Sequence, residues 1–113
     1  LNEEAHRALL LEEMYRNHDP DGVARQIAGM AVAGDRRSRL ATITAPTLVI
    51  HGTDDPLIPP ACGHDTALSI PNAIYLPIEG MGHDLPRELD RTVIEAICNV
   101  AGKKILAGTQ PPA

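Results

Sequence analysis

Two turns near the middle of the chain carry the side chains that could do chemistry. The first turn follows the apolar run Thr47–His51 and offers Asp54 and Asp55. The second follows the run Ala73–Ile78 and offers Glu79, His83 and Asp84. A carboxylate that accepts from one histidine ring nitrogen fixes the tautomer, and the other ring nitrogen can then take a proton from a nucleophile. An acid from one turn and a histidine from the other therefore make up two thirds of a catalytic triad.

The runs that must position these turns have the pattern of neighbouring parallel strands. The run Thr47–His51 lacks polar alternation and lies between a proline and a glycine, which is typical of a strand buried on both faces. The segment from Pro59 to Ile70 is predicted to be helical, so strand, helix and strand form a βαβ unit of about 32 residues. Because ligands bind outside the carboxyl ends of such strands, we expect an acid of the first turn and a histidine of the second to meet there.

Helices are expected in the rest of the chain. Three precede the sheet, from Asn2 to Asn17, from Pro20 to Gly34 and from Asp35 to Leu40. A last helix is expected from Pro86 to Gly102. Its predicted buried face consists of Leu89, Val93, Ile94, Ile97 and Val100. We divide the chain into a helical segment (1–44), a βαβα segment (45–107) and a frayed tail (108–113).

Composition excludes several classes of function. The 113 residues include 2% aromatic residues and carry a formal net charge of -5, and the one basic run is Arg36, Arg37 and Arg39. Nucleic acid is therefore not an expected partner. No run approaches the ~20 apolar residues of a membrane span, so we expect no membrane contact and a soluble, cytoplasmic protein. The sequence begins at Leu1 rather than Met, which is compatible with a preceding segment that carries a leader.

The motifs at the two turns resemble those of a known family. Residues 46–56, Pro-Thr-Leu-Val-Ile-His-Gly-Thr-Asp-Asp-Pro, closely resemble the late strand and acid turn of α/β-hydrolases. Residues 80–83, Gly-Met-Gly-His, resemble the histidine loop after the last strand of that fold. The resemblance covers residues 40–102 and is to the ester-hydrolysing branch, including polyketide methyl-esterase-like and haloperoxidase-like members. It implies an α/β fold, the C-terminal portion of an α/β-hydrolase core, with residues 1–44 as the end of a helical cap.

The resemblance also implies roles for particular residues. Asp55 corresponds to the family's acid and His83 to its general base, with Asp54 as the alternative acid. Met81 and Leu57, in the same two turns, are candidate substrate-binding residues. The implied reaction is hydrolysis of an ester, or another acyl-type bond, in a small apolar substrate. The implied site needs no cofactor and no metal.

A nucleophile with the family's pattern is missing from the sequence. The family places its serine in a G-x-S-x-G elbow. The two serines here, Ser38 and Ser69, lack the flanking glycines, and Cys62 precedes Gly63 without a strand before it. The residues that would form an oxyanion hole are missing as well. We therefore expect these 113 residues to be inactive alone, as the C-terminal part of a longer enzyme or as a truncated product.

Two other interpretations compete with this one. The first is a metal site, since imidazole and carboxylate suit zinc or non-haem iron. Its candidate ligands are His51, Asp54, Asp55, His64, Asp65, His83 and Asp84. No pair has a helix-face spacing, and a strand-end histidine such as His51 is commonly packed and hydrogen-bonded. The second is a non-catalytic fragment that persists by self-association through unpaired sheet edges, or by pairing with a missing N-terminal half.

Overall fold

The computed structural model describes residues 2–107 of the chain, with side chains described through Gly102. It divides into two compact units, residues 1–36 and residues 37–113. The predicted tail, residues 108–113, lies outside the described residues. No helix in the described part of the chain is long and apolar enough to cross a membrane.

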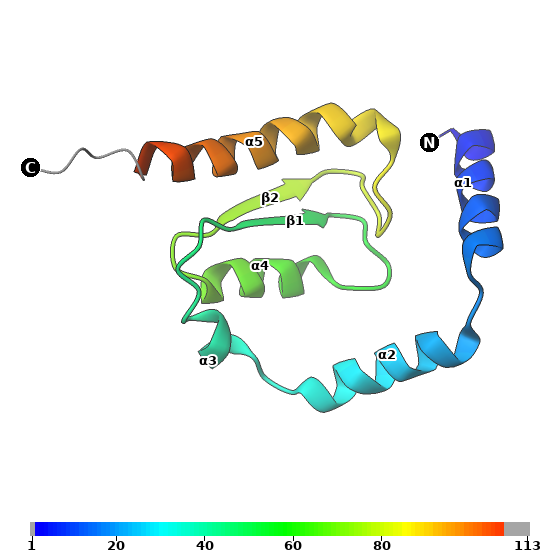
Figure 1. Ribbon diagram of the computed structural model, residues 1–113, viewed down its shortest axis with the longest axis horizontal. Helices are drawn as coiled ribbons and strands as arrows, with labels where there is room; N and C mark the ends of the chain where they lie inside the picture. Colours follow the sequence, from blue (N-terminus) through cyan, green and yellow to red (C-terminus); the bar gives the residue numbers. More distant parts are fainter. Residues whose placement is uncertain (1, 108–113) are drawn as a thin grey trace, which may run out of the picture. The chain divides into compact units, whose positions relative to one another are not determined.

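The first unit consists of two helices, α1 (Glu3–Arg16) and α2 (Pro20–Ala33) (Figure 1). The Asn2 side chain caps α1 by accepting from the Ala5 N–H at 3.2 Å, and α1 ends at Asn17 as predicted. Helix α2 begins with proline and ends at Gly34, also as predicted. Neither helix contains a buried residue, so this unit contributes no core of its own.

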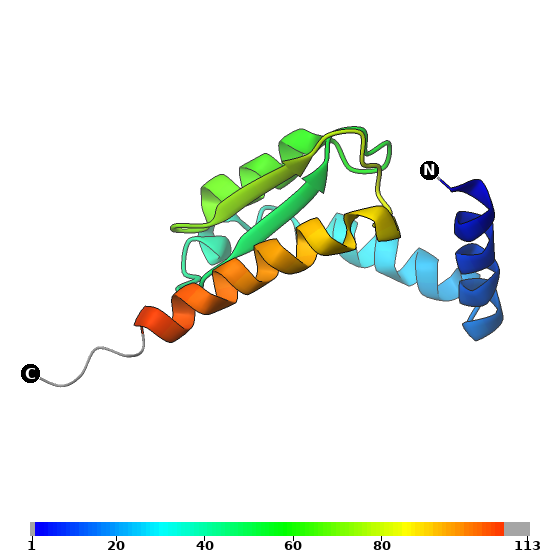
Figure 2. The ribbon, with the colours of Figure 1, turned by 90° about the horizontal axis from the view of Figure 1, so that it is seen from above.

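The second unit is a parallel two-stranded sheet between helices. Its elements in chain order are α3 (Arg37–Leu40), β1 (Leu48–Gly52), α4 (Pro60–Ser69), β2 (Ile74–Ile78), the 3-10 turn η1 (Arg87–Leu89) and α5 (Asp90–Ala107). The strands pair in register from Leu48 with Ile74 to Gly52 with Ile78. Figures 1 and 2 show α4 and α5 on opposite faces of the sheet. This arrangement confirms the predicted α/β fold and matches the C-terminal portion of an α/β-hydrolase core.

Alternation along the strands decides which residues meet which helix. Successive side chains of a strand point to opposite faces. Ile50 and Leu76 are register partners, and they pack with Leu89 against a buried cluster of Ile78, Met81 and Val93 on the α5 face. The neighbouring residues His51 and Tyr75 point to α4 instead, where the Tyr75 hydroxyl donates to the Pro60 carbonyl at 3.4 Å.

Burial in the sheet is lower than the sequence pattern predicts. Within β1, Leu48 to His51 are half-buried and Gly52 alone is buried. The prediction of a strand buried on both faces is therefore wrong in degree. Helices cover the two faces, but each strand in the described part of the chain pairs along one edge and leaves the other open.

The last helix differs from its predicted form in length and in its buried face. It continues to Ala107 instead of ending at Gly102, because a glycine inside a helix costs only about 1 kcal/mol and good helix formers follow it. Val93 and Val100 are buried as predicted, but Ile94 and Ile97 are 57% and 52% exposed. A two-stranded sheet is too narrow to cover the whole apolar face of α5.

Gly52 ends β1 at the point where the loop after β2 crosses closest to it. A Cβ at this position would overlap the carbonyl oxygens of Met81 and Gly82, which are backbone atoms and cannot rotate away. A glycine is therefore required for the two loops to meet. In contrast, a Cβ at Gly82 would meet no atom within 4 Å.

We predict that Gly52→Ala lowers the free energy of unfolding by about 1–3 kcal/mol, because the loop must move to admit the methyl group. Urea unfolding of the full chain measures this change. Gly82→Ala is the matched control, and we expect it to alter the same free energy by less than about 0.5 kcal/mol. Equal effects of the two substitutions would contradict the proposed close approach.

Candidate active site

The acid turn (residues 53–58) and the histidine loop (residues 79–85) are held side by side by backbone hydrogen bonds. The Thr53 N–H donates to the Ile78 carbonyl and the Asp54 N–H to the Met81 carbonyl, both at 3.0 Å. The Thr53 hydroxyl accepts from the Gly80 N–H at 3.0 Å. The bonds at Thr53 and Ile78 extend the strand pairing by one step beyond the sheet. Both loops therefore start from fixed positions at the carboxyl end of the strands, as predicted.

The Asp55 carboxylate is almost fully buried and is bonded at both oxygens. Its side chain is 5% exposed. Oδ1 accepts from the backbone N–H groups of Leu57 and Ile58, at 2.8 and 2.9 Å. This local bonding is the Asx-turn that aspartate favours after a strand, and it fixes the side chain rotamer. Oδ2 is left to face the histidine loop.

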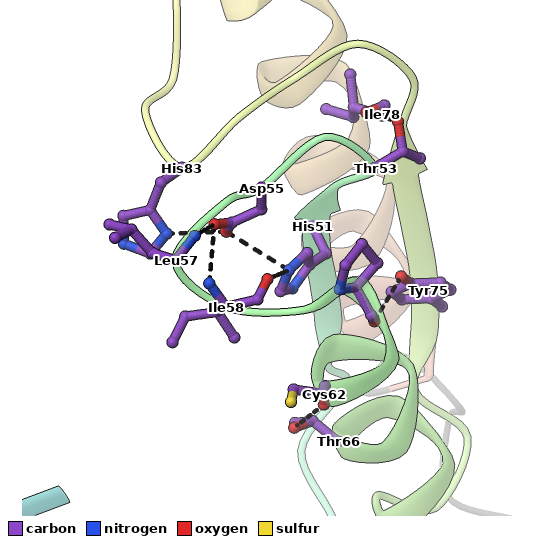
Figure 3. A network of polar contacts seen from close by, with 11 residues as sticks. His51, Thr53, Asp55, Leu57, Ile58, Cys62, Thr66, Tyr75, Ile78 and His83 are labelled. Atoms are coloured by element: carbon purple, nitrogen blue, oxygen red, sulfur yellow. Dashed lines mark hydrogen bonds and ion pairs between the residues drawn. The ribbon is translucent and has the colours of Figure 1, made fainter.

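His83 bonds to that second oxygen. Its Nδ1 lies 2.8 Å from Asp55 Oδ2, although the two residues are 28 positions apart in the chain (Figure 3). An ionised carboxylate can only accept, so Nδ1 carries the proton and Nε2 presents a lone pair. The His83 side chain is 51% exposed, so one edge of the ring is held and the rest can meet a reactant.

The surroundings of Asp55 keep it ionised. Its pKa is lowered from the ordinary 3.8 to about 2, chiefly by the hydrogen bond from the Ile58 N–H. Burial acts in the opposite direction, and the bonds from His83 and from the Leu57 N–H lower the pKa further. Asp55 is therefore a carboxylate at any neutral pH. It can orient His83 and stabilise an imidazolium there without taking up the proton itself.

The other predicted site residues occupy different surroundings. The Asp54 carboxylate accepts from the Thr53 hydroxyl at 3.1 Å, while the contact with His83 is made by Asp55. Met81 is 9% exposed and packs in the buried cluster against α5. Leu57 is 67% exposed beside Asp55. Substrate binding by Met81 and Leu57 stays a prediction.

The two serines lie on elements that lead into the strands. Ser69 ends α4, and its hydroxyl donates to the Asp65 carbonyl at 2.7 Å. Ser38 lies in α3, which packs against α4. Because α4 returns from the end of β1 to the start of β2, Ser69 and His83 lie at opposite ends of the sheet (Figure 1). Ser69 is therefore not positioned beside His83.

Cysteines and metal ligands complete the inventory of reactive groups. Cys62 and Cys98 are both free and exposed. Among the residues that the structure describes, no three His, Cys, Asp or Glu side chains are grouped so as to hold a metal ion.

Two features of the site escape the sequence motifs. The Thr53 hydroxyl joins the acid turn to the histidine loop, and the His51 ring lies under the acid turn with Nε2 2.9 Å from the Ile58 carbonyl. The expectation that His51 is packed and hydrogen-bonded is confirmed, since its side chain is 11% exposed. The identity of its partners could not be predicted, because they depend on how the turn folds back over the strand.

Comparison with known proteins gives relatives whose names are those of hydrolases. The chain is 41% identical over 63 residues to rhodomycin D methylesterase DauP of Streptomyces sp. strain C5, and 38% identical over 63 residues to rhodomycin D methylesterase DnrP of Streptomyces peucetius. Each match covers 56% of this chain and 21% of the relative. It is also 34% identical over 82 residues to a protein provisionally named carbamate hydrolase RutD, from Serratia proteamaculans, covering 69% of this chain and 30% of that one.

The chain thus spans less than a third of the length of the relatives that it matches. No protein-family model matches it.

We predict that the low pKa of Asp55 makes folding stability depend on acid pH. The folded state binds this proton at about pH 2 and the unfolded state at about 3.8, so the stabilisation is complete above pH 3.8 and is lost as the pH falls to 2. Thermal unfolding between pH 5 and pH 2 measures it. Asp55→Asn should unfold at a lower temperature than the wild type at pH 5, and the difference should close at pH 2.

Asp54→Asn is the matched control for this experiment. It removes the same charge from the same turn but leaves the bond between Asp55 and His83 in place. We expect it to keep the acid-dependent fall in unfolding temperature. A fall that persists unchanged in Asp55→Asn would assign the stabilisation to another group.

Proposed function

We propose that Asp55 and His83 are the acid and the base of an acyl hydrolase. The hydrolase names of the relatives and the resemblance of the motifs to those of esterase-like α/β-hydrolases support this proposal. The observation that carries the proposal is the 2.8 Å bond from His83 Nδ1 to a buried carboxylate, on a ring that is half exposed. This bond leaves Nε2 as the proton acceptor.

The proposed reaction needs a serine from outside these 113 residues. Its Oγ attacks the ester carbonyl carbon while its proton passes to His83 Nε2. The C–O bond to the leaving alcohol then breaks, and His83 returns the proton to that oxygen. Water attacks the acyl-serine carbonyl carbon in the same way and gives its proton to His83. The bond between this carbon and the serine Oγ then breaks, His83 returns the proton to Oγ, and the carboxylic acid leaves. Throughout, Asp55 stays ionised and stabilises the imidazolium formed at His83.

The geometry supports Asp55 rather than Asp54 as the acid. Two backbone N–H groups bonded to Oδ1 fix the rotamer of the Asp55 side chain, and Oδ2 accepts from the His83 ring. The Asp54 carboxylate bonds to the preceding threonine. A carboxylate that is held before substrate arrives needs no reorganisation in the transition state.

The substrate class proposed is an ester, or another acyl-type bond, in a small apolar molecule. The names of two relatives describe methylesterases, and the third describes a carbamate hydrolase. Ester and carbamate share a carbonyl carbon that a serine can attack. The exposed Leu57, next to the acid, offers apolar contact at the mouth of the site. Neither the leaving group nor the acyl part is specified by the acid–base pair.

The proposal predicts a clear order of losses in a chimaera. In it, this chain replaces the matching segment of rhodomycin D methylesterase DnrP of Streptomyces peucetius, and the rest of that protein is expected to supply the serine. Methyl ester hydrolysis should fall by roughly 10⁴-fold or more in His83→Ala and by about 10⁴-fold in Asp55→Asn, because the tautomer of His83 is lost. Asp54→Asn, the matched control, should stay close to the parent rate.

Three outcomes would oppose the proposal. A folded His83→Ala chimaera with a normal rate would remove the base from the mechanism. Loss of activity in Asp54→Asn with retention in Asp55→Asn would transfer the acid role to Asp54. A folded chimaera that shows no hydrolysis at all would favour the alternative, a non-catalytic fragment that persists through association.

A further inference from the structure

A second histidine lies behind the acid, on the side away from His83. The His51 side chain is 11% exposed and projects from β1 toward α4, beneath the acid turn (Figure 3). Its Nε2 lies 2.9 Å from the Ile58 carbonyl oxygen and 3.5 Å from Asp55 Oδ2. Nothing in the proposed reaction uses this ring, yet it faces the same carboxylate oxygen as His83.

The partners of His51 determine which nitrogen carries its proton. A carbonyl oxygen and an ionised carboxylate are acceptors only, so Nε2 must be the donor. The other nitrogen, Nδ1, faces Gly63 in the first turn of α4, where a Cβ would overlap it. Glycine at this position makes the room that the ring occupies. The ring is therefore fixed in place with its N–H pointing at the acid turn.

Ile58 connects the two groups through its backbone. Its N–H donates to Asp55 Oδ1 at 2.9 Å, and its carbonyl accepts from His51 at 2.9 Å. The same N–H is the main cause of the low pKa of Asp55. The N–H and the carbonyl belong to the two peptide units that meet at the Ile58 Cα. A change that frees the carbonyl would loosen the backbone on one side of this Cα, and would thereby weaken the N–H bond that keeps the acid ionised and aimed at His83.

We propose that His51 is a positioning residue, whose Nε2–H clamps the Ile58 carbonyl and the Asp55 carboxylate so that Asp55 Oδ2 stays directed at His83. The effect on the carboxylate follows from the contacts alone, whereas the effect on catalysis rests on the proposed function. A ring that only fills space would need no hydrogen-bond donor at this position. Substitutions that keep the side-chain volume but remove the donor therefore distinguish a packing role from a positioning role.

The test is an NMR titration of the Asp55 carboxyl in the full 113-residue chain, with Asp54 as an internal reference in the same turn. His51→Gln keeps an amide N–H at the position of Nε2, and we expect the Asp55 pKa to stay at about 2. His51→Leu keeps volume without the donor, and we expect this pKa to rise toward 3.8.

A third variant covers the case in which the leucine chain does not fold. His51→Asn is polar, but its amide reaches only the position of Nδ1, short of Ile58, so it should raise the Asp55 pKa as leucine does. An unchanged Asp55 pKa in a folded His51→Leu or His51→Asn chain would overturn the proposal. So would an equal rise in the glutamine variant, because the donor would then be irrelevant.

The consequence for catalysis is measured separately in the methylesterase chimaera. His51→Leu should lower kcat by up to about 100-fold with little change in KM, and His51→Gln should restore most of the loss. If Asp55→Asn leaves hydrolysis unchanged, the proposed function fails while the titration result stands. If Asp55→Asn abolishes hydrolysis but the titration is insensitive to His51, the positioning role alone fails.

Discussion

The Asp55 carboxylate is the group on which both functional loops depend. One oxygen holds its own turn through two backbone N–H groups, and the other holds the histidine loop through His83. The Asp55 side chain is 5% exposed, and a carboxylate is costly to bury unless its oxygens are hydrogen-bonded. The surrounding donors are therefore needed for the fold as well as for any chemistry. Loss of these bonds would loosen the contact between the acid turn and the histidine loop.

The rest of the second unit works to hold this carboxylate in place. The parallel register of β1 and β2 brings the two loops to the same end of the sheet, and Gly52 lets the histidine loop cross against the strand. Helix α5 covers one face through Val93, and α4 covers the other through the close approach of Gly63 to His51. The hydrogen-bond donors to Asp55 are thus two backbone N–H groups and the half-exposed ring of His83, and the backbone groups need little ordering.

The central contact of the site could be predicted because it follows from a general property of parallel sheets. An apolar run without polar alternation, followed by a helix and a second apolar run, indicated parallel strands, and parallel strands place the residues that follow them at one edge of the sheet. Asp55 and His83 therefore meet despite their separation in the chain. The functional roles of these residues were implied by family resemblance and stay a proposal.

Other features depend on long-range packing that local patterns do not contain. The exposure of Ile94 and Ile97 follows from the width of the sheet, and the extension of α5 past Gly102 follows from the residues beyond it. The clamp by His51 requires the acid turn to fold back over β1 and α4 to offer a glycine there. A single histidine in a strand carries no local sign of this arrangement.

The most direct measurement is ¹⁵N NMR of the ring nitrogens of His83 in its neutral form. The bond to an ionised Asp55 requires the proton on Nδ1, whereas an unconstrained neutral histidine prefers it on Nε2. We predict a protonated Nδ1 and an unprotonated Nε2 in the full chain, and a shift toward the Nε2–H form in Asp55→Asn. An Nε2–H tautomer in the wild-type chain would contradict the assignment of Asp55 and His83 as an acid–base pair.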